Sequence, residues 1–143
     1  ASGNYFSKRG TVPAFLFPRY QVCANSDCAT LSEHSEGLIE HNEKFQEMLC
    51  KAPNCKGRGK RRAPTIPAPF VVACPSGHID DFPWRAYVHR DDGTSCKRMK
   101  LFSTGNTGSV ADLQVRCACD KTRSVSDASV PYTHLTLTTK RIV

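Results

Sequence analysis

The segment CPSGHIDDFPW (residues 74–84) decides how the chain is interpreted. It holds a thiol, an imidazole, two carboxylates and the chain's only tryptophan. These side chains either meet at a metal or catalytic centre, or build one tight structural corner between a strand and a helix. The first arrangement is typical of a small metal-dependent enzyme, and the second of a binding module. The residues on both sides of the segment favour the structural corner.

A short helix is predicted at the end of this segment, from about Phe82 to Arg90. Asp80 or Asp81 is placed to cap its first turn, and Pro83 is tolerated there because an N–H at that position would have no helical partner. One face of the predicted helix then carries Trp84, Tyr87 and Val88. We therefore expect the tryptophan to pack in the core rather than stack on a nucleic-acid base.

The composition predicts a thin hydrophobic core. Only 39% of the 143 residues are apolar, and nine Gly and nine Pro interrupt regular structure. Chains of this kind are usually held together by disulfides or metal ions, and eight Cys are present to form either. The sequence shows no secretory signal and no apolar run that would span a membrane. We therefore expect a cytoplasmic, reducing environment and metal ligation rather than disulfides.

The charge of the chain favours an acidic partner. The formal net charge is +7, from 20 Lys and Arg against 13 Asp and Glu. Two zinc sites with four thiolates each would lower that charge by four, to about +3. A mild excess of positive charge favours binding to nucleic acid or to another acidic molecule, and its distribution matters more than its sum.

Two segments before the basic loop are expected to be ordered. Residues 1–19 are interpreted as an extended N-terminal strand. Residues 36–49 (EGLIEHNEKFQEML) have apolar residues on roughly one helical face, and a hairpin that turns near His41 and Asn42 is the alternative. The apolar positions in question are Leu38, Ile39, Phe45, Met48 and Leu49.

The second half of the chain is predicted to be rich in strands. FVVAC (70–74) has the β-branched composition of a short strand. Residues 101–119 predict a strand, a Gly-rich turn at 105–108, one helical turn capped by Ser109, and a strand that ends at Cys117 and Cys119. The Thr-rich segment 129–143 is either a strand at a sheet edge or a poorly structured tail.

Four cysteines of the first half have the pattern of a structural zinc site. Cys23 and Cys28 (CANSDC) form one short-range pair, and Cys50 and Cys55 (CKAPNC) form another. Zinc takes four tetrahedral thiolates, and short-range pairs bring them together with little loss of chain entropy. The four-residue gaps are wider than the usual two, but both contain residues that favour turns. Two disulfides are the alternative.

A second zinc site is predicted from the other cysteines, Cys74, Cys96, Cys117 and Cys119. CPSGH resembles a metal-binding turn, and CAC can supply two ligands from one strand end. His78 and His89 are competing ligands. Cys74 could equally be a small core residue, because it follows an apolar strand.

A catalytic site is the alternative use of the same region. A hydrolytic metal site with an open coordination position would use His78, Asp80, Asp81 and His89. In the commoner arrangement, Asp81 caps the helix and Asp80 pairs with Arg85 or Arg90. His78 is then a zinc ligand or a hydrogen-bonded imidazole. The chain has no Walker loop, nucleophile elbow or dinucleotide fingerprint. We therefore expect a protein without catalytic residues.

The basic run KGRGKRR (56–62) has the composition of a phosphate-binding loop. Its cations are Lys56, Arg58, Lys60, Arg61 and Arg62. Glycines between them let the charged groups follow a nucleic-acid backbone. The proline-rich APTIPAP segment that follows would keep the run exposed. A merely solvated loop is the alternative.

These observations predict an α+β fold: a small, zinc-stabilised, zinc-ribbon-like module with short strands and one or two short helices. Residues 1–62 form a zinc-ribbon-like half with the basic connector. Residues 63–128 form a second Cys/His half that contains GHIDDFPW, and residues 129–143 form a tail. The two halves are alternatively parts of one compact domain.

Three stretches resemble a known family: PRYQVCANSDCATL, FVVACPSGHIDDFPWRAYVHR and GSVADLQVRCACDKTRSV. They are similar, in this order, to the DrmB-like proteins of the DISARM phage-defence system, over about residues 12–128. The resemblance implies DNA-associated work beside a superfamily 2 helicase partner, as one part of a longer protein. It assigns no catalytic role to any residue. The chain departs from the expected pattern in its wide Cys pairs, in its tight CAC and in Asp120, where a glycine would be usual.

The sequence thus favours a zinc-binding module that contacts DNA or a helicase subunit, with zinc as its cofactor. A small metal-dependent hydrolase is the second hypothesis, and a purely structural role in protein–protein contacts is the third.

Overall fold

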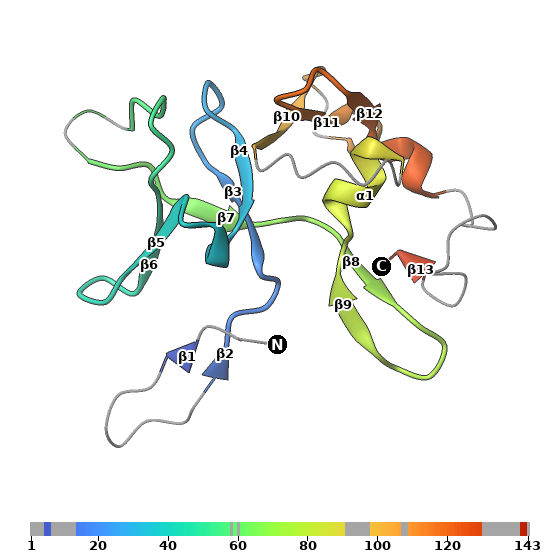
Figure 1. Cartoon of the computed structure of the whole chain (residues 1–143), viewed down its shortest axis with the longest axis horizontal. Coiled ribbons are helices and arrows are strands. Elements are labelled where there is room, and N and C mark those ends of the chain that lie inside the picture. Colours follow the sequence, from blue (N-terminus) through green and yellow to red (C-terminus); the bar gives the residue numbers. More distant parts are fainter. Residues whose placement is uncertain are drawn as a thin grey trace.

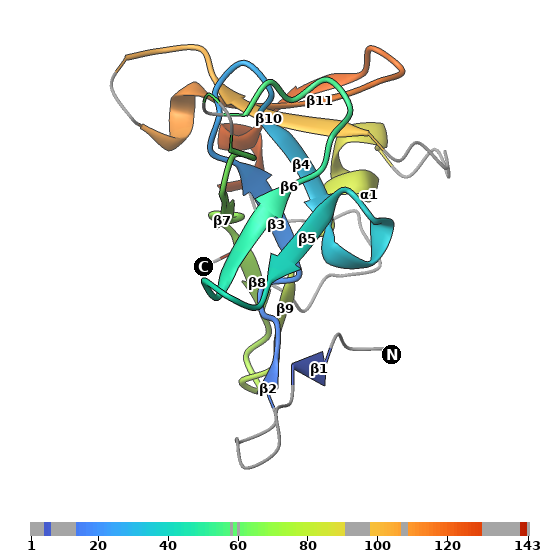
Figure 2. The ribbon, with the colours of Figure 1, turned by 90° about the vertical axis from the view of Figure 1, so that its left-hand side faces the viewer.

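The computed structural model describes residues 5–6, 14–57, 59, 61–90, 98–106, 109–129 and 141–142 (Figures 1 and 2). Its largest element is an antiparallel sheet with the strand order β12-β11-β10-β4-β3-β7. The strands are β3 (Tyr20–Cys23), β4 (Thr30–Glu33), β7 (Thr65–Pro67), β10 (Met99–Ser103), β11 (Leu113–Cys117) and β12 (Thr122–Ser124). Segments that are far apart in the sequence therefore pair within one sheet.

Smaller antiparallel groups surround this sheet. β5 (Ile39–Asn42) pairs with β6 (Glu47–Cys50), and β1 (Tyr5–Phe6) pairs with β2 (Ala14–Phe15). β8 (Val71–Ala73) lies between β9 (Ile79–Asp81) and β13 (Arg141–Ile142). Short 3-10 helices are formed by His34–Glu36, Val110–Asp112 and Val125–Ser129. The strand predicted near 70–74 is confirmed, and residues 141–142 form the edge strand that was one of the two interpretations of the tail.

One face of the six-stranded sheet carries the hydrophobic core. Side chains alternate between the faces of a strand, and one registered row consists of the buried residues Val22, Leu31, Met99 and Cys117. The helix α1 (Trp84–His89) contacts β11 and β12 and adds Trp84, Tyr87 and Val88 to the same cluster. The Phe82 ring packs edge-on, with its centroid 4.6 Å from that of Trp84. The predicted short helix and the core position of the tryptophan are confirmed.

Asp81 does not cap this helix. The N-cap position is Pro83, which makes no side-chain capping bond. The buried Asp81 carboxylate accepts hydrogen bonds from the Arg19 backbone N–H at 2.7 Å and from Arg19 Nε at 2.9 Å. Asp80 also lies beside Arg19, at 3.5 Å. The prediction of an aspartate cap is wrong, because the arginine before β3 offers the carboxylates both charge and donors.

Residues 36–49 form a hairpin and not a helix. β5 and β6 are in register from Ile39 opposite Cys50 to Asn42 opposite Glu47. Gln46 has a φ of 54°, in the left-handed region that a tight turn requires. Of the apolar residues that suggested a helical face, Ile39 lies in β5, and Met48 and Leu49 lie in β6. The turn between the strands, residues 43–46, follows directly after the predicted turn at His41 and Asn42.

The prediction for residues 101–119 is confirmed for its two strands and for the turn that Ser109 caps. The second strand ends at Cys117, and Cys119 lies in the turn after it. Residues 107–108 of the predicted Gly-rich turn lie outside the described residues. β10 and β11 pair from Met99 opposite Cys117 to Ser103 opposite Leu113. Between them, Ser109 Oγ accepts the backbone N–H of Ala111 at 3.2 Å, at the start of the 3-10 turn.

The α+β, zinc-ribbon-like fold class is wrong. The described residues form mostly antiparallel β-structure, with a single α-helix of six residues. The cysteine spacing suggested a zinc ribbon. However, β3 and β4, which are joined by the turn of the first cysteine pair, are part of a wider sheet that includes β10–β12. No helix in this part of the chain is long and apolar enough to cross a membrane.

Replacing Asp81 distinguishes the observed ion pair from a helix cap. Asn caps a helix about as well as Asp, so a cap would tolerate Asp81→Asn. In the ion pair, the amide removes the charge and turns an NH2 group toward the donors of Arg19. We expect a loss of about 2 kcal/mol in the free energy of unfolding, measured by urea denaturation. The exposed Asp80→Asn control should lose less than about 1 kcal/mol; equal losses in the two variants would contradict this assignment.

Candidate metal centres

Two turns with the same hydrogen bonds present the first cysteine cluster. Cys23 ends β3 and Cys50 ends β6. In each turn, the residue two positions after the first cysteine donates its backbone N–H to the sulfur of that cysteine. Asn25 donates to Cys23, and Ala52 donates to Cys50. The carbonyl of that same residue then accepts the N–H of the second cysteine, Cys28 or Cys55, at 3.0 Å in both turns. The two six-residue segments are therefore structurally equivalent.

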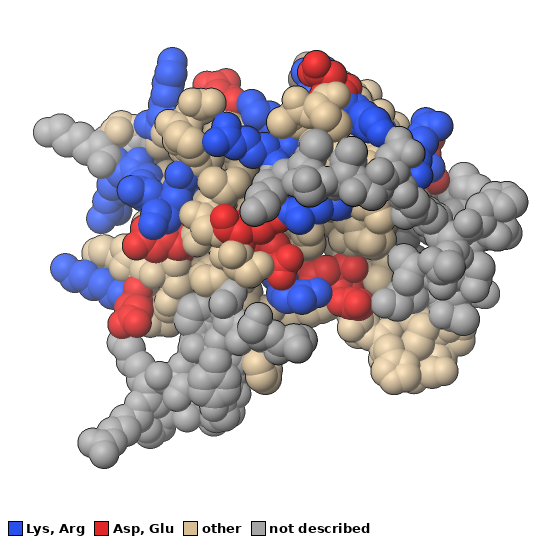
Figure 3. Space-filling model, viewed as in Figure 1, with Lys and Arg blue, Asp and Glu red and all other residues tan. Residues whose placement is uncertain are grey.

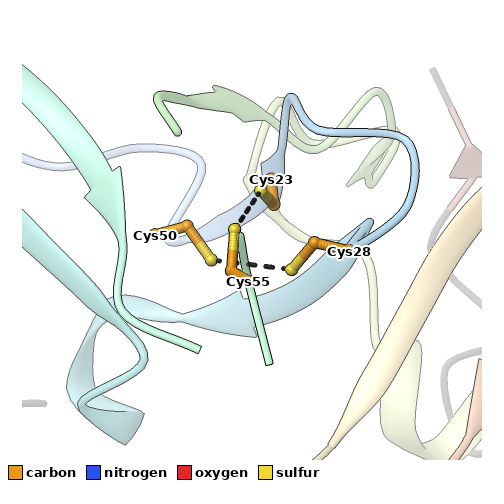
Figure 4. A group of neighbouring side chains, drawn as sticks. All are labelled: Cys23, Cys28, Cys50 and Cys55. Atoms are coloured by element: carbon orange, nitrogen blue, oxygen red, sulfur yellow. Dashed lines mark hydrogen bonds between the residues drawn. The ribbon is translucent and has the colours of Figure 1, made fainter. Parts of the chain in front are cut away.

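The four sulfur atoms have the separations of a tetrahedral thiolate site. All four lie within 4.8 Å of one another. Cys23 lies 3.7 Å from Cys55 and Cys28 lies 3.8 Å from Cys50, so the close pairs join the two turns (Figure 4). A metal–sulfur distance of about 2.3 Å in a tetrahedron implies sulfur–sulfur separations of about 3.8 Å, whereas a disulfide requires about 2.05 Å. These four residues fit a metal ion, and none of the described cysteines is in a disulfide.

Burial makes this cluster unfavourable for unpaired thiolates. Burial raises the pKa of the Cys23 thiol, and it raises that of Cys50 to about 11. Burial also acts to raise the pKa of Cys28, but hydrogen bonds with the hydroxyl and backbone of Thr30, together with those to Cys55 and Cys23, outweigh it and lower the pKa of this thiol. The Thr30 hydroxyl lies 3.1 Å from the Cys28 sulfur. A divalent cation would supply the positive charge that four thiolates in this mostly buried cluster require.

A second cluster joins the helix to the sheet. His89 near the end of α1, Cys117 at the end of β11 and Cys119 have ligand atoms within 4.8 Å of one another. His89 Nδ1 lies 2.8 Å from the Arg85 carbonyl, and its Nε2 lies 3.3 Å from the Cys119 sulfur. This is the usual arrangement of a metal-binding histidine, in which one nitrogen donates to a carbonyl and the other faces the metal.

In the turn after β11, Asp120 adopts a left-handed backbone conformation in which glycine is the usual residue. Asp120 has a φ of 66°, and its N–H donates to the Cys117 carbonyl at 3.0 Å. A glycine is usual in this left-handed conformation, and aspartate is among the residues that also adopt it.

The structure separates other residues predicted for the second site. Cys74 lies in the β8–β9 turn, where its sulfur is 3.1 Å from His78 Nδ1 and also accepts the His78 N–H. Among the described residues, this pair belongs to neither cluster. Cys96 lies outside the described residues. His89, predicted as a competing ligand, takes part instead.

The alternative catalytic set is also divided. His78 contacts Cys74, Asp80 and Asp81 contact Arg19, and His89 faces Cys119. Within the described part of the chain, the first three of these residues form no common group with His89. Arg85, an expected partner of Asp80, pairs with Glu36.

The basic loop 56–62 lies directly after the second cysteine turn. Lys56, Arg61 and Arg62 are exposed, whereas Arg58 and Lys60 lie outside the described residues. Gly57 has a φ of 66°, its carbonyl accepts Asn25 Nδ2 at 3.2 Å, and an added Cβ would meet the Arg61 carbonyl. The loop is therefore anchored to the first cysteine turn. Figure 3 shows Lys and Arg side chains spread along the upper part of the face drawn.

Sequence reasoning did not identify the role of Thr30. Its position two residues after Cys28, at the start of β4, was the available signal, because a hydroxyl there can reach back to the sulfur.

Comparisons with known proteins give two findings. A family model described as a domain of unknown function, DUF8724, matches residues 3–141. The chain is also 37% identical over 123 residues to the DISARM protein DrmB of Bacillus paralicheniformis. This match includes 85% of the chain but only 20% of the relative, so the chain spans about a fifth of that protein's length. The resemblance to DrmB-like proteins is confirmed. The DUF8724 match extends on both sides beyond residues 12–128, over which the sequence resembles DrmB-like proteins.

Substitution of one cluster cysteine tests whether the first cluster holds a metal ion that stabilises the fold. Cys50→Ser should lower the free energy of unfolding by more than about 3 kcal/mol, because metal binding at such a site is coupled to folding. Cys74→Ser is the matched control and should change it by less than about 0.5 kcal/mol. Both values come from urea denaturation followed by circular dichroism. A Cys50→Ser protein as stable as the control would contradict a structural metal site.

Proposed function

The chain belongs to the DUF8724 family, and we propose that it is a zinc-stabilised, DNA-contacting module of a larger phage-defence protein. The observation that carries the metal assignment is the separation of 3.7 and 3.8 Å between sulfurs of the two equivalent turns. The similarity to a DISARM protein supports the defence role.

Zinc is the metal that the ligands favour. Cys23, Cys28, Cys50 and Cys55 would hold one ion, because a set of four soft thiolates selects zinc over hard cations such as magnesium and calcium. His89, Cys117 and Cys119 would hold a second ion. Both ions would be structural and would hold loops in place. A cytoplasmic location fits this proposal, since reducing conditions keep the thiols available to zinc.

Loop 56–62 is the proposed DNA contact. Its described cations are exposed, and the loop joins the second cysteine turn to β7. Zinc at the first cluster would fix both ends of this stretch, because Cys55 precedes the loop and the buried Ala63 follows it within the same cluster. A rigid base with flexible cations suits contacts to phosphates, which position a protein without reading sequence.

A helicase subunit is the proposed neighbour in the assembly. The support is the resemblance to DrmB-like proteins, together with the chain's share of only 20% of its relative. The hydrolase hypothesis is not favoured, because its four candidate residues are divided among three places. His78 contacts Cys74, both aspartates contact Arg19, and His89 contacts Cys119.

Removal of the loop charges tests DNA contact. The variant Lys60→Ala/Arg61→Ala/Arg62→Ala should weaken binding to duplexes of any sequence. It should flatten the slope of log K against log salt by about 2 to 3 units, since each phosphate contact contributes about 0.9. Fluorescence anisotropy over a salt series gives both quantities.

The matched control keeps the charges. Lys60→Arg/Arg61→Lys/Arg62→Lys should retain the wild-type slope, and the melting temperature of both variants should stay close to that of wild type. If a folded triple-alanine variant keeps the wild-type affinity and slope, the loop is only a solvated connector.

A further inference from the structure

The outer face of the six-stranded sheet, opposite the hydrophobic core, carries a row of polar and cationic residues. Lys100 on β10 is directly opposite Arg116 on β11, and the row continues to Thr30 on one side and Thr122 on the other. Like charges directly opposite each other destabilise an antiparallel pair. The neighbouring strands offer these cations hydroxyl groups and no carboxylate in that row.

The two cations line a cavity of about 330 Å³. Its wall includes Arg98 as a third cation, and its acidic members are Asp27 and Asp120. No ion pair within the described residues joins Arg98, Lys100 or Arg116 to either aspartate. Arg116 instead donates from Nε to the Thr122 hydroxyl at 3.3 Å and lies 5.5 Å from the Phe102 ring centroid. The cations are therefore held beside the cavity without an ion pair to its two carboxylates.

The walls of this cavity come from the two proposed metal sites. Cys28 and the turn residues Ala52, Pro53 and Asn54 belong to the first site, and Cys117 and Ala118 belong to the second. Metal ions at both sites would fix the shape of the cavity. The volume lies at the lower end of the range for small-ligand sites.

We propose that this cavity binds a phosphate group of a nucleic-acid strand, through Lys100 and Arg116 with Arg98 at its edge. Two adjacent cations with nearby hydroxyl groups match the charge and acceptor oxygens of a phosphodiester. The first site's turn leads directly from the cavity wall at Asn54 to loop 56–62. A strand bound by the loop could therefore continue onto the sheet. The inference deepens the proposed DNA contact but uses residues other than those of the loop.

The test compares sheet and loop variants of the intact, zinc-loaded chain. The probe is a fluorescein-labelled 15-nucleotide oligothymidylate, and anisotropy is measured over a salt series. Lys100→Ala/Arg116→Ala should weaken binding about tenfold at 0.1 M salt and lower the salt slope by about 1.4, since each single-strand contact contributes about 0.7. The charge-preserving Lys100→Arg/Arg116→Lys should bind within about threefold of wild type.

A second variant should change affinity in the opposite direction. Asp27→Asn/Asp120→Asn removes the two carboxylates of the cavity and should tighten binding several-fold, because it raises the positive potential there. Asn at position 120 tolerates the left-handed backbone conformation. Lys51→Ala/Arg90→Ala removes two exposed cations that do not line the cavity, and it should leave the slope within about 0.5 of wild type.

The outcomes separate this inference from the loop proposal. If the sheet variant binds like wild type while the loop variant loses affinity, the cavity assignment is overturned and the loop proposal stands. If only the sheet variant loses affinity, the cavity is supported and the loop is not. If inorganic phosphate or ATP binds as tightly as the oligonucleotide, the cavity is a small-anion site, which overturns its assignment to a strand.

Discussion

The gathering of four thiols, three of them buried, is the constraint on which the rest of the molecule depends. The hairpin β5–β6 meets the sheet at a small cluster whose buried members are Cys23, Cys28, Cys50 and Ala63. Such a cluster has too little apolar surface to hold two elements together, and unpaired thiolates in it would be poorly solvated. A divalent cation at the centre of the four sulfurs removes both difficulties. It would join the ends of β3 and β6 and fix the base of loop 56–62 and one wall of the cavity on the sheet.

The two faces of the six-stranded sheet have different roles: one packs in the hydrophobic core, and the other carries cations. Strand alternation places Val22, Leu31 and Met99 toward α1, where aromatic packing forms the main core. It places Lys100 and Arg116 on the other face, beside the first cysteine cluster. The second cluster joins the helix to the end of β11 through His89 and Cys117. The face that carries the cations is partly covered, since Gln21 and Ser32 on it are buried, whereas Lys100 and Arg116 on β10 and β11 are exposed.

Local patterns in the sequence predicted local features well. The helix near residue 84, the core tryptophan, the strands around residues 101–117 and the first cysteine quartet follow from periodicity and spacing. Long-range pairing was not predictable in the same way. The partner of Asp81 is Arg19, 62 positions earlier, and a local cap was the simplest assumption without it. The hairpin at 39–50 brings Cys50 to the first cysteine cluster, a long-range contact that the helical spacing of its apolar residues did not reveal. His89 replaces Cys74 in the second cluster because folding brings the end of α1, rather than the β8–β9 turn, to Cys119.

Zinc K-edge X-ray absorption tests the central claim most directly. The sample is the purified chain with His89→Gln and Cys119→Ser, which removes two of the three described ligands of the second cluster and isolates the first. We expect bound zinc with a shell of four sulfur atoms at about 2.3 Å. A shell that contains nitrogen or oxygen ligands, or a folded chain that holds disulfides and no zinc, would contradict it.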